Sequence, residues 1–379
     1  MKLKTKIRYY ISHYDPIYSG AGKSLEKLMY SLDHNKFSLE VITAYKKGLE
    51  RIEERDKYKI IRGGGKFFKK NGYMNILGKI YFSISSAVYN FRNNDYDVIC
   101  FIGVGIVSFP SIKISKFFSK KIINKITAVG DDDPRKLSKS IMGRSIIRNL
   151  KNARHWIISK EIYDICIKYS NWDKKNLYFI TNPVNVKFNS YDLLSSKREE
   201  YKKDKNRLDF LFVGVLNERK GIDVLLDIWN NHNIEANLML CGPRGNDIKI
   251  NTMLDSINKK NIIEYDEVDF DFIMEKYLSS DYFIFPSNRE GLPNVVLEAM
   301  SFGIPIIANN IPGVTDFLLG ENRGILINNN QISSWTDILQ KAINHNIDTL
   351  SISSNAYDWI SKNSEFSIVR SKIQKMYTE

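Results

Sequence analysis

The sequence predicts an α/β protein made of two doubly wound, Rossmann-like domains, each with a parallel sheet covered by helices on both faces. Three observations lead to this class. The chain has 379 residues, more than one hydrophobic core usually serves. Short apolar, β-branched runs alternate with helix-like segments along its length, the pattern typical of parallel sheets. That alternation is interrupted near residue 190, which gives each half its own sheet.

The first domain is expected over residues 1–190. Its strand-like runs are short, rich in Ile, Val, Tyr and Phe, and separated by segments of helical character. The expected strands are Ile7–Ser12, Leu39–Thr43, Val98–Ile102, Ile122–Ala128, His155–Ser159 and Tyr178–Thr181.

The boundary is indicated by Asn182-Pro183-Val184-Asn185 and by the charged run over 197–205, a pattern typical of a linker and an exposed helix. The second domain is expected over residues 191–359, and the segment from Tyr357 to Tyr377 is expected to be helical. The expected strands of this domain are Asp209–Val215, Ala236–Cys241, Ile262–Tyr265, Tyr282–Pro286, Ile304–Ala308 and Gly324–Ile327.

Charge is distributed unevenly over the two halves. The chain carries a net charge of +13, of which residues 1–190 contribute +20 and residues 191–379 contribute −7. Halves of opposite charge indicate different partners. A nucleic-acid-binding protein is the main alternative from another class, because a basic half attracts phosphate backbones. The sequence has no helix-turn-helix, zinc-finger or RNP-type signature, so no nucleic-acid partner is expected.

Cysteine and hydropathy patterns favour a cytoplasmic protein. Cys100, Cys166 and Cys241 are odd in number and far apart, which suggests neither a disulfide framework nor a metal cluster. The basic start turns polar before an apolar segment of signal length develops. The longest apolar stretch, Val98–Ile112, is too short to span a bilayer. Any membrane contact is therefore expected to be peripheral.

The most informative segment runs from Phe285 to Met300 and reads as a strand, a polar loop and a helix opened by Pro293. Glu290 lies on the loop and Glu298 lies further along the helix, so the two carboxylates can hold different hydroxyl-bearing parts of one ligand. Free N–H groups at the helix start form a natural diphosphate site. The residues expected to contact the ligand there are Gly291, Leu292, Pro293, Asn294 and Val295.

A Glu-x7-Glu spacing occurs often by chance, but the string continues through Ser301-Phe302-Gly303-Ile304-Pro305 and on to Pro312-Gly313-Val314. In this form it resembles the retaining glycosyltransferases of the GT-B fold, specifically the family 4 group. The resemblance implies a nucleotide-sugar donor, no further cofactor, a cleft between the domains, and a terminal helix (360–379) that returns to the first domain. It assigns Glu290 to the transferred sugar and Glu298 to the nucleotide ribose.

Two glycine-containing turns extend the resemblance. Gly214, Arg219 and Lys220 lie on a strand-to-helix turn of the kind that places cations on the donor phosphates. Many family members have Arg where this chain has Val215, and Arg219 is the expected substitute. Near the start, the turn of Gly20, Ala21 and Gly22 corresponds to the small-residue loop that meets the diphosphate from the first domain. This turn is not a Walker A loop, because Ile17 occupies a position that requires Gly.

The sugar pocket is less well defined. Many family members carry a His near Gly130, where this chain has Asp131; Asp131 and His13 are the candidates, against the alternatives of a capping loop and an ordinary loop residue. Asp131–Asp133 and Asp269–Asp271 contain Asp-x-Asp, but both lack supporting ligands, so no metal is expected.

The acceptor is expected on the basic first domain, and the resemblance implies a glycan or a lipid-pyrophosphate-linked acceptor of surface polysaccharide assembly. Cations mixed with large apolar residues over Lys66–Lys70 with the following helix, and over Lys113–Lys121, fit either an anionic membrane surface or a helix packed on its own core. A sugar-nucleotide epimerase of the same fold remains an alternative activity.

Overall fold

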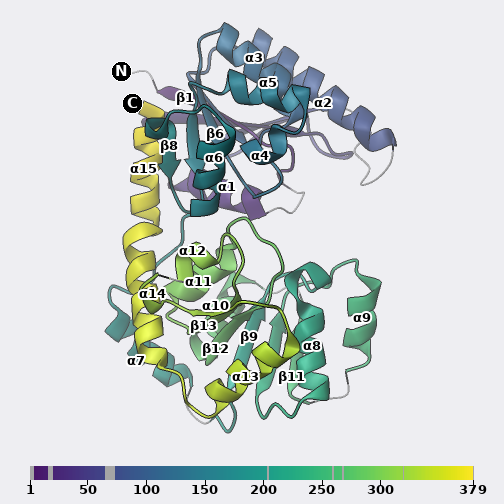
Figure 1. Cartoon of the computed structure of the whole chain (residues 1–379). Helices are drawn as coiled ribbons and strands as arrows, with labels where there is room; N and C mark the ends of the chain where they lie inside the picture. The colour runs from purple at the N-terminus through teal and green to yellow at the C-terminus, as the bar shows by residue number, and fades with distance from the viewer. Residues whose placement is uncertain are drawn as a thin grey trace. The chain divides into compact units, whose positions relative to one another are not determined.

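The computed structural model describes residues 4–15, 20–64, 73–202, 205–257, 260–266, 269–318 and 320–378. The chain divides into two compact units. The first unit contains residues 1–183 and 366–379, and the second contains residues 184–365. Both are α/β layers of a mainly parallel sheet with helices on its faces (Figure 1).

The first unit has an eight-stranded sheet in the order β3-β4-β2-β1-β5-β6-β7-β8. All neighbouring strands are parallel except β3 and β4, which are antiparallel. The strands are β1 (Thr5–Tyr10), β2 (Phe37–Ala44), β3 (Ile52–Glu54), β4 (Lys59–Gly63), β5 (Val98–Ile102), β6 (Lys121–Lys125), β7 (Arg154–Ile157) and β8 (Leu177–Phe179).

The six strands expected in this half are all present, and the sequence did not predict β3 and β4. Both carry charged residues at positions where a buried strand usually has apolar ones. In β4 the apolar pair Ile60-Ile61 lies between Lys59 and Arg62, and Arg62 is buried because Glu53 of β3 pairs with it. Tertiary ion pairing, which no local pattern reveals, therefore completes this edge of the sheet.

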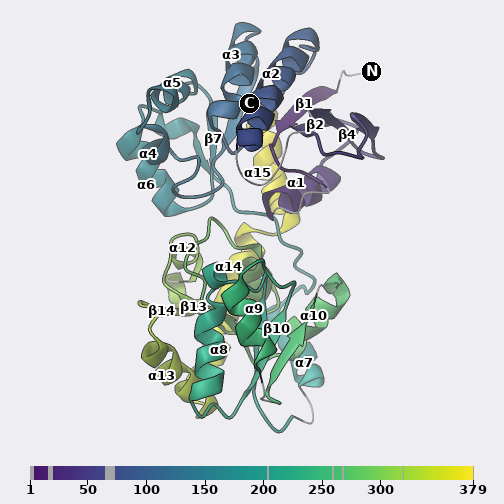
Figure 2. The same ribbon diagram turned by 90° about the vertical axis from the view of Figure 1, so that its right-hand side faces the viewer.

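The helices of the first unit include α2 and α3, which pack side by side (Figure 1 and Figure 2). The helices are α1 (Gly20–Ser31), α2 (Tyr73–Arg92), α3 (Phe109–Phe117), α4 (Pro134–Leu137), α5 (Ile141–Asn149), α6 (Lys160–Tyr169) and α15 (Phe366–Thr378), with short 3-10 turns η1 (Ile106–Ser108) and η2 (Lys174–Asn176).

The second unit has a six-stranded sheet, entirely parallel, in the order β11-β10-β9-β12-β13-β14. This is the order of a Rossmann sheet. Every strand expected in this half is present. The strands are β9 (Asp209–Val213), β10 (Asn237–Cys241), β11 (Ile262–Tyr265), β12 (Tyr282–Phe285), β13 (Ile306–Asn309) and β14 (Ile325–Ile327).

The helices of the second unit pack against this sheet and contribute buried side chains to its apolar core. Trp229, Met300 and Trp335 are examples. The helices are α7 (Tyr191–Tyr201), α8 (Ile222–Asn231), α9 (Ile248–Asp255), α10 (Phe270–Ser279), α11 (Asn294–Ser301), α12 (Thr315–Leu318), α13 (Ile332–Ile343) and α14 (Thr349–Asn363), with 3-10 turns η3 (Glu218–Lys220) and η4 (Gly320–Asn322).

The units divide after residues 183 and 365, whereas the sequence analysis expected divisions after residues 190 and 359. Val184 belongs to the second unit because its N–H donates to Ser364 O at 2.8 Å and its side chain is buried in that unit's core. The helix α7, which the charge pattern suggested was exposed, is anchored by buried Arg198. The Arg198 guanidinium donates to the carbonyls of Tyr277, Phe302 and Ser280.

The terminal segment forms two helices rather than one. The helix α14 ends at Asn363 in the second unit, and α15 begins at Phe366 in the first. The buried hydroxyls of Tyr9 and Tyr377 hydrogen-bond at 2.6 Å, which fastens α15 to β1. The expected return of the terminal helix to the first domain is thus present in the structure.

The three cysteines are free thiols and are buried, in keeping with the spacing that argued against a disulfide framework. Within the described ranges, no helix is both long enough and apolar enough to cross a bilayer.

Candidate functional site

The centre of the second sheet is where its strand order reverses. The chain continues from β9 to β10 on one side and from β12 to β13 on the other, while β9 and β12 pair with each other. The loops that leave the carboxyl ends of these two strands therefore lie together. Ligands bind at such switch points in open α/β sheets.

Glu290, on the loop after β12, is held at this point by three donors. Its Oε1 accepts from Lys220 Nζ at 2.7 Å and from Arg219 Nη1 at 3.0 Å, both on the loop after β9. Ser287 Oγ donates to the same oxygen at 2.7 Å. The side chains of Lys220 and Glu290 are 12% and 11% exposed, whereas that of Arg219 is 51% exposed. The structure thus brings together the expected Glu290, Lys220 and Arg219, and adds Ser287.

Lys220 is positioned by its backbone and by the residues before it. The Asn217 side chain caps the 3-10 turn η3 by accepting from Lys220 N at 3.0 Å. Lys220 Nζ lies 5.1 Å from the centre of the Phe285 ring, and a Cβ on Gly214 would lie 3.8 Å from Lys220 Cε. Burial lowers the pKa of Lys220, and the Glu290 carboxylate opposes that shift. The ammonium is therefore largely removed from water, which strengthens its interaction with any anionic group that binds beside it.

Glycines allow the loops of the site to approach one another closely. Gly221 follows Lys220 with φ of +75°, and a Cβ there would lie 2.3 Å from the Pro286 carbonyl oxygen. A Cβ on Gly313 would lie 1.9 Å from the Gly291 carbonyl oxygen. Both contacts leave no room for a side chain. The two glycines fix the spacing of the loops around Glu290.

Glu298 lies on α11 (Asn294–Ser301), the helix that follows the Glu290 loop. The helix begins at Asn294, with Pro293 as its N-cap, so the expectation that Pro293 occupies the first helical position is wrong by one residue. The buried Tyr277 of α10 supports this helix: its hydroxyl donates to Val295 O at 3.2 Å and lies 3.5 Å from Glu298 Oε2. Leu292 is half-buried beside the apolar core.

The turn expected in the first unit forms the first residues of α1. Gly20, Ala21 and Gly22 are its opening residues, so they provide a helix start at the carboxyl side of β1 rather than a free loop. Residues 16–19, which directly precede this turn and include Ile17, lie outside the described residues.

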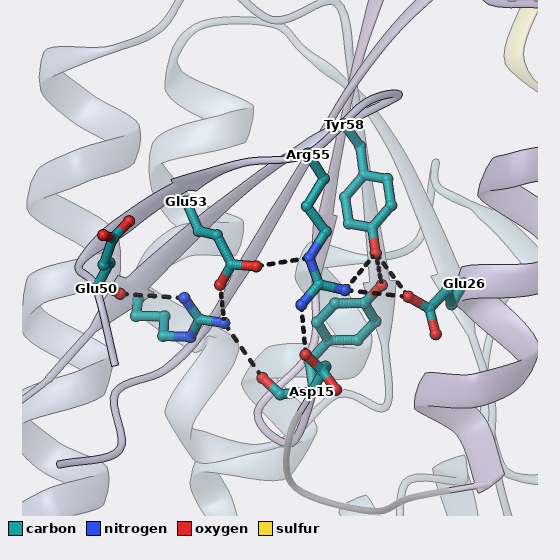
Figure 3. A network of polar contacts seen from close by, with 8 residues as sticks. Asp15, Glu26, Glu50, Glu53, Arg55 and Tyr58 are labelled. Atoms are coloured by element: carbon teal, nitrogen blue, oxygen red, sulfur yellow. Dashed lines mark hydrogen bonds and ion pairs between the residues drawn. The ribbon is translucent and has the colours of Figure 1, made fainter. Parts of the chain in front are cut away.

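An ion-pair network joins Asp15, which follows β1, to α1 and β3 (Figure 3). The Arg55 guanidinium contacts Asp15, binds Glu26 of α1 at 3.2 Å, and binds Glu53 of β3 at 2.6 Å. Tyr58 joins it by donating to Glu26 at 2.8 Å. Asp15 precedes the α1 turn and Glu26 follows it, so the network fixes the backbone on both sides. No sequence pattern pointed to Arg55, because its partners come from three separate segments.

His13 and Asp131 are placed on loops at the carboxyl edge of the first sheet. Partial burial and the charge of Lys79 lower the pKa of His13. Asp131 is exposed after β6, while the next two residues have structural partners. Asp132 accepts from Thr127 N at 2.8 Å, and burial raises its pKa to about 7. Asp133 caps α4, which confirms a capping loop; the sugar-pocket roles of His13 and Asp131 stay predictions.

A cluster of metal ligands is not evident in the described part of the chain, where no three or more His, Cys, Asp or Glu side chains gather as a site. Asp269 of the second Asp-x-Asp sequence caps α10 by accepting from Phe272 N at 2.8 Å.

Residues 195–359 match the family described as "Glycosyl transferases group 1". The matched segment is a little under half of the chain and includes all the contacts made by Glu290.

Two relatives are similar over about half of their own length. An uncharacterized glycosyltransferase of Haemophilus influenzae is 30% identical over 173 residues, which cover 42% of this chain and 48% of the relative. The UDP-Gal:alpha-D-GlcNAc-diphosphoundecaprenol alpha-1,3-galactosyltransferase of Escherichia coli is 30% identical over 195 residues, which cover 48% of this chain and 49% of the relative.

The solved structures that resemble the whole chain are GT-B glycosyltransferases. Sucrose-phosphate synthase from Thermosynechococcus elongatus has a TM-score of 0.79 at 15% identity, with 99% of this chain and 98% of that chain covered. At this identity the likeness concerns the fold alone, and it confirms the predicted fold class.

Proposed function

We propose that this chain is a glycosyltransferase that takes its sugar from a nucleoside-diphosphate donor. The observation that carries the proposal is the Glu290 carboxylate held between Lys220, Arg219 and Ser287 at the switch point of the second sheet. The match of residues 195–359 to a glycosyltransferase family covers all four residues.

The chemistry of the leaving group explains why two cations belong here. When the bond between sugar and phosphate breaks, the departing nucleoside diphosphate gains negative charge. Fixed positive groups in a desolvated site stabilise that charge as it develops. Lys220 is desolvated and adjacent to Arg219, so both can transfer from Glu290 to the diphosphate when the donor binds. Arg219 then takes the place of the cation that Val215 does not supply.

The two carboxylates are assigned different parts of the donor. Glu290 faces the cations and contacts the transferred sugar, while Glu298 accepts hydrogen bonds from the ribose hydroxyls. The N–H groups from Gly291 to Val295, at the start of α11, meet the diphosphate. The family 4 resemblance assigns Gly20, Ala21 and Gly22 of the first unit to the same group. Retention of the anomeric configuration follows from that resemblance and belongs to this proposal.

The acceptor is proposed to be a glycan or a lipid-pyrophosphate-linked glycan, at the inner face of the cell membrane. The name of the E. coli relative, which includes a diphosphoundecaprenol acceptor, supports an acceptor of this class. A hexose or N-acetylhexosamine is proposed as the transferred sugar. No cofactor or metal is assigned a role in the transfer.

A panel of nucleotide sugars tests this proposal directly. The purified chain is incubated with UDP-, GDP- and ADP-linked sugars, and release of the nucleoside diphosphate is measured with and without membrane extract. The proposal expects slow hydrolysis of one donor, accelerated by the acceptor, and loss of both rates in Lys220→Ala. If no nucleotide sugar binds better than its free nucleoside diphosphate, the proposal is wrong. A donor returned as its epimer would indicate the alternative activity of an epimerase.

A further inference from the structure

The helix α2 has its polarity reversed with respect to an ordinary surface helix. Its inward face is largely small and polar, and includes the buried side chains of Ser83, Ser86 and Asn90. Its outward face is apolar, and Ile80 and Ile84 are 51% and 55% exposed. A surface helix normally buries its apolar stripe and exposes its polar one. The exposed residues of this stripe are Ile76, Leu77, Ile80, Tyr81, Ile84, Val88 and Phe91.

The apolar stripe continues onto α3. The ring of Phe91, near the end of α2, lies 5.6 Å from that of Phe118, which in turn lies 5.0 Å from that of Phe117. Phe117 is the most exposed of these aromatic residues, at 76%. The two helices pack side by side (Figure 1 and Figure 2). The contacts of Phe91, Phe118 and Phe117 therefore join the apolar side chains of the two helices into one surface. We call the exposed side chains of α2 together with Phe117 and Phe118 the apolar face.

The charges on the helices that carry this surface are all positive. The sequences of α2, α3 and the neighbouring α5 contain no Asp or Glu. Their basic side chains are exposed to solvent, and Lys113 lies 5.7 Å from the centre of the Phe109 ring. A surface that is apolar and cationic at once differs from a simple basic patch. The exposed bases are Lys79, Arg92, Lys113, Lys116, Arg144 and Arg148.

We propose that the apolar face docks on an anionic lipid bilayer, with the neighbouring lysines and arginines on the lipid phosphates. Large apolar side chains at the acyl boundary and cations at the headgroups are the two contributions that hold interfacial helices. A second copy of the chain fits this surface poorly, because two faces without a carboxylate would bring like charges together. A nucleic acid would neutralise the cations but leave the apolar side chains of α2 exposed.

The proposal agrees with one of the two alternatives expected from the sequence for this helix. Phe82 is fully buried against the sheet, whereas Ile76, Leu77, Ile80 and Tyr81 are exposed. The basic run Lys66–Lys70 that precedes α2 lies outside the described residues and has no part in the argument.

Sedimentation with vesicles tests the docking surface. The whole chain is mixed at low ionic strength with vesicles of phosphatidylcholine alone or with equal parts of phosphatidylglycerol, and the bound fraction is measured. Binding to the anionic vesicles only is expected. The double variant Ile80→Asp with Ile84→Asp is expected to bind about tenfold more weakly or worse. The double variant Lys113→Glu with Lys116→Glu is expected to lose a factor of at least about five for each cation removed.

A matched control separates the surface from a general effect of charge or folding. Leu350 is 65% exposed on α14 in the second unit, so Leu350→Asp with Lys341→Glu places one substitution of each kind away from the apolar face. This control is expected to bind vesicles like the unchanged protein. Circular dichroism of each variant confirms that it is folded.

The proposal would be overturned if the unchanged protein did not bind anionic vesicles, or if the α2 variants bound them as tightly as the unchanged protein does. It would also be overturned if velocity sedimentation showed a dimer that the Ile80 and Ile84 substitutions dissociate. Tighter binding to a random oligonucleotide than to vesicles would overturn it as well. The proposed function explains why membrane docking would be useful, since it would bring the enzyme to a lipid-linked acceptor. The docking itself does not depend on that function. Hydrolysis of the donor in solution is measured separately, so either proposal can fail while the other stands.

Discussion

The Glu290 carboxylate is the residue around which the site of the second unit is built. One of its oxygens accepts from Lys220, Arg219 and Ser287 at distances between 2.7 and 3.0 Å. A buried carboxylate without such partners would be costly, because desolvation disfavours its charge. The three donors hold one oxygen of the carboxylate in place. In the proposed donor complex the two cations bind the diphosphate, and Ser287 is the donor that remains on Glu290.

Ser287 is therefore expected to act as a positioning residue. The variant Ser287→Ala loses a hydrogen bond to a charged group, which is usually worth about 1.5–3 kcal/mol. We expect kcat to fall about tenfold or more with a smaller change in KM for the donor, because the substrate is still bound by Lys220 and by α11. Ser287→Thr, which keeps the hydroxyl, should recover most of the rate. Equal kcat values for Ser287→Ala and the unchanged protein would contradict the role.

The sequence identified Glu290, Lys220 and Arg219 through the motifs that contain them, and the structure places all three in contact. It did not identify Ser287 or Tyr277. A serine in a polar loop is common, and its contact with Glu290 depends on how the segment 287–290 turns. Tyr277 reaches α11 from a different helix, across 21 residues of sequence from Glu298. Such contacts are decided by tertiary packing and leave no local pattern.

Among the elements, the parallel strands were the most predictable. A strand buried on both faces is usually a continuous apolar run, and Val98–Ile102, whose five residues are all buried, has the bounds expected from the sequence alone. The hairpin of β3 and β4 was missed because β4 buries Arg62, and the ion pair of Arg62 with Glu53 is a tertiary contact that no local pattern reveals. The break between α14 and α15 was also missed, since the segment from Tyr357 to Tyr377 has no Pro or Gly to mark a helix end.

The turn from η3 to α8 is the element that holds Lys220 in place, and Gly221 is its most constrained residue. An alanine there would adopt a left-handed conformation, which costs about 1–2 kcal/mol, and its Cβ would also collide with the Pro286 carbonyl oxygen. We expect Gly221→Ala to lower both the thermal stability and kcat/KM, because relief of the collision moves Lys220 away from Glu290.

Gly48→Ala is the control for this prediction. Gly48 has φ of +92°, and a Cβ there would have no other atom within 4 Å, so the substitution carries the conformational cost without a collision. Thermal unfolding of both variants should show a larger loss for Gly221→Ala. Comparable losses, or unchanged activity in Gly221→Ala, would mean that the turn does not position Lys220.

At the scale of the whole molecule, the two units differ in charge and in what they offer to a partner. The half with net charge +20 forms most of the first unit and carries the apolar face of α2 and α3. The half with net charge −7 contains the switch point, where Lys220 and Arg219 contact Glu290. Our proposals place the acceptor and the membrane on the first unit, and the donor mainly on the second.

Glu290 and Glu298 both lie in the second unit and are expected to have different roles toward the donor. Glu298 lies beside Tyr277 on α11, whereas Glu290 binds both Lys220 and Arg219. A residue that contacts the ribose holds the donor equally before and during the reaction, so its loss raises KM. A residue beside the transferred sugar acts on the reacting bond, so its loss lowers kcat.

Steady-state kinetics of Glu290→Gln and Glu298→Gln, on whichever nucleotide sugar the unchanged protein hydrolyses, tests the central claim most directly. Glu290→Gln is expected to lower kcat by at least about a hundredfold with little change in KM. Glu298→Gln is expected to raise KM for the donor about tenfold and to weaken binding of the nucleoside diphosphate, with kcat nearly unchanged. Small and equal effects of the two substitutions would contradict the assignment of this site to a nucleotide-sugar donor.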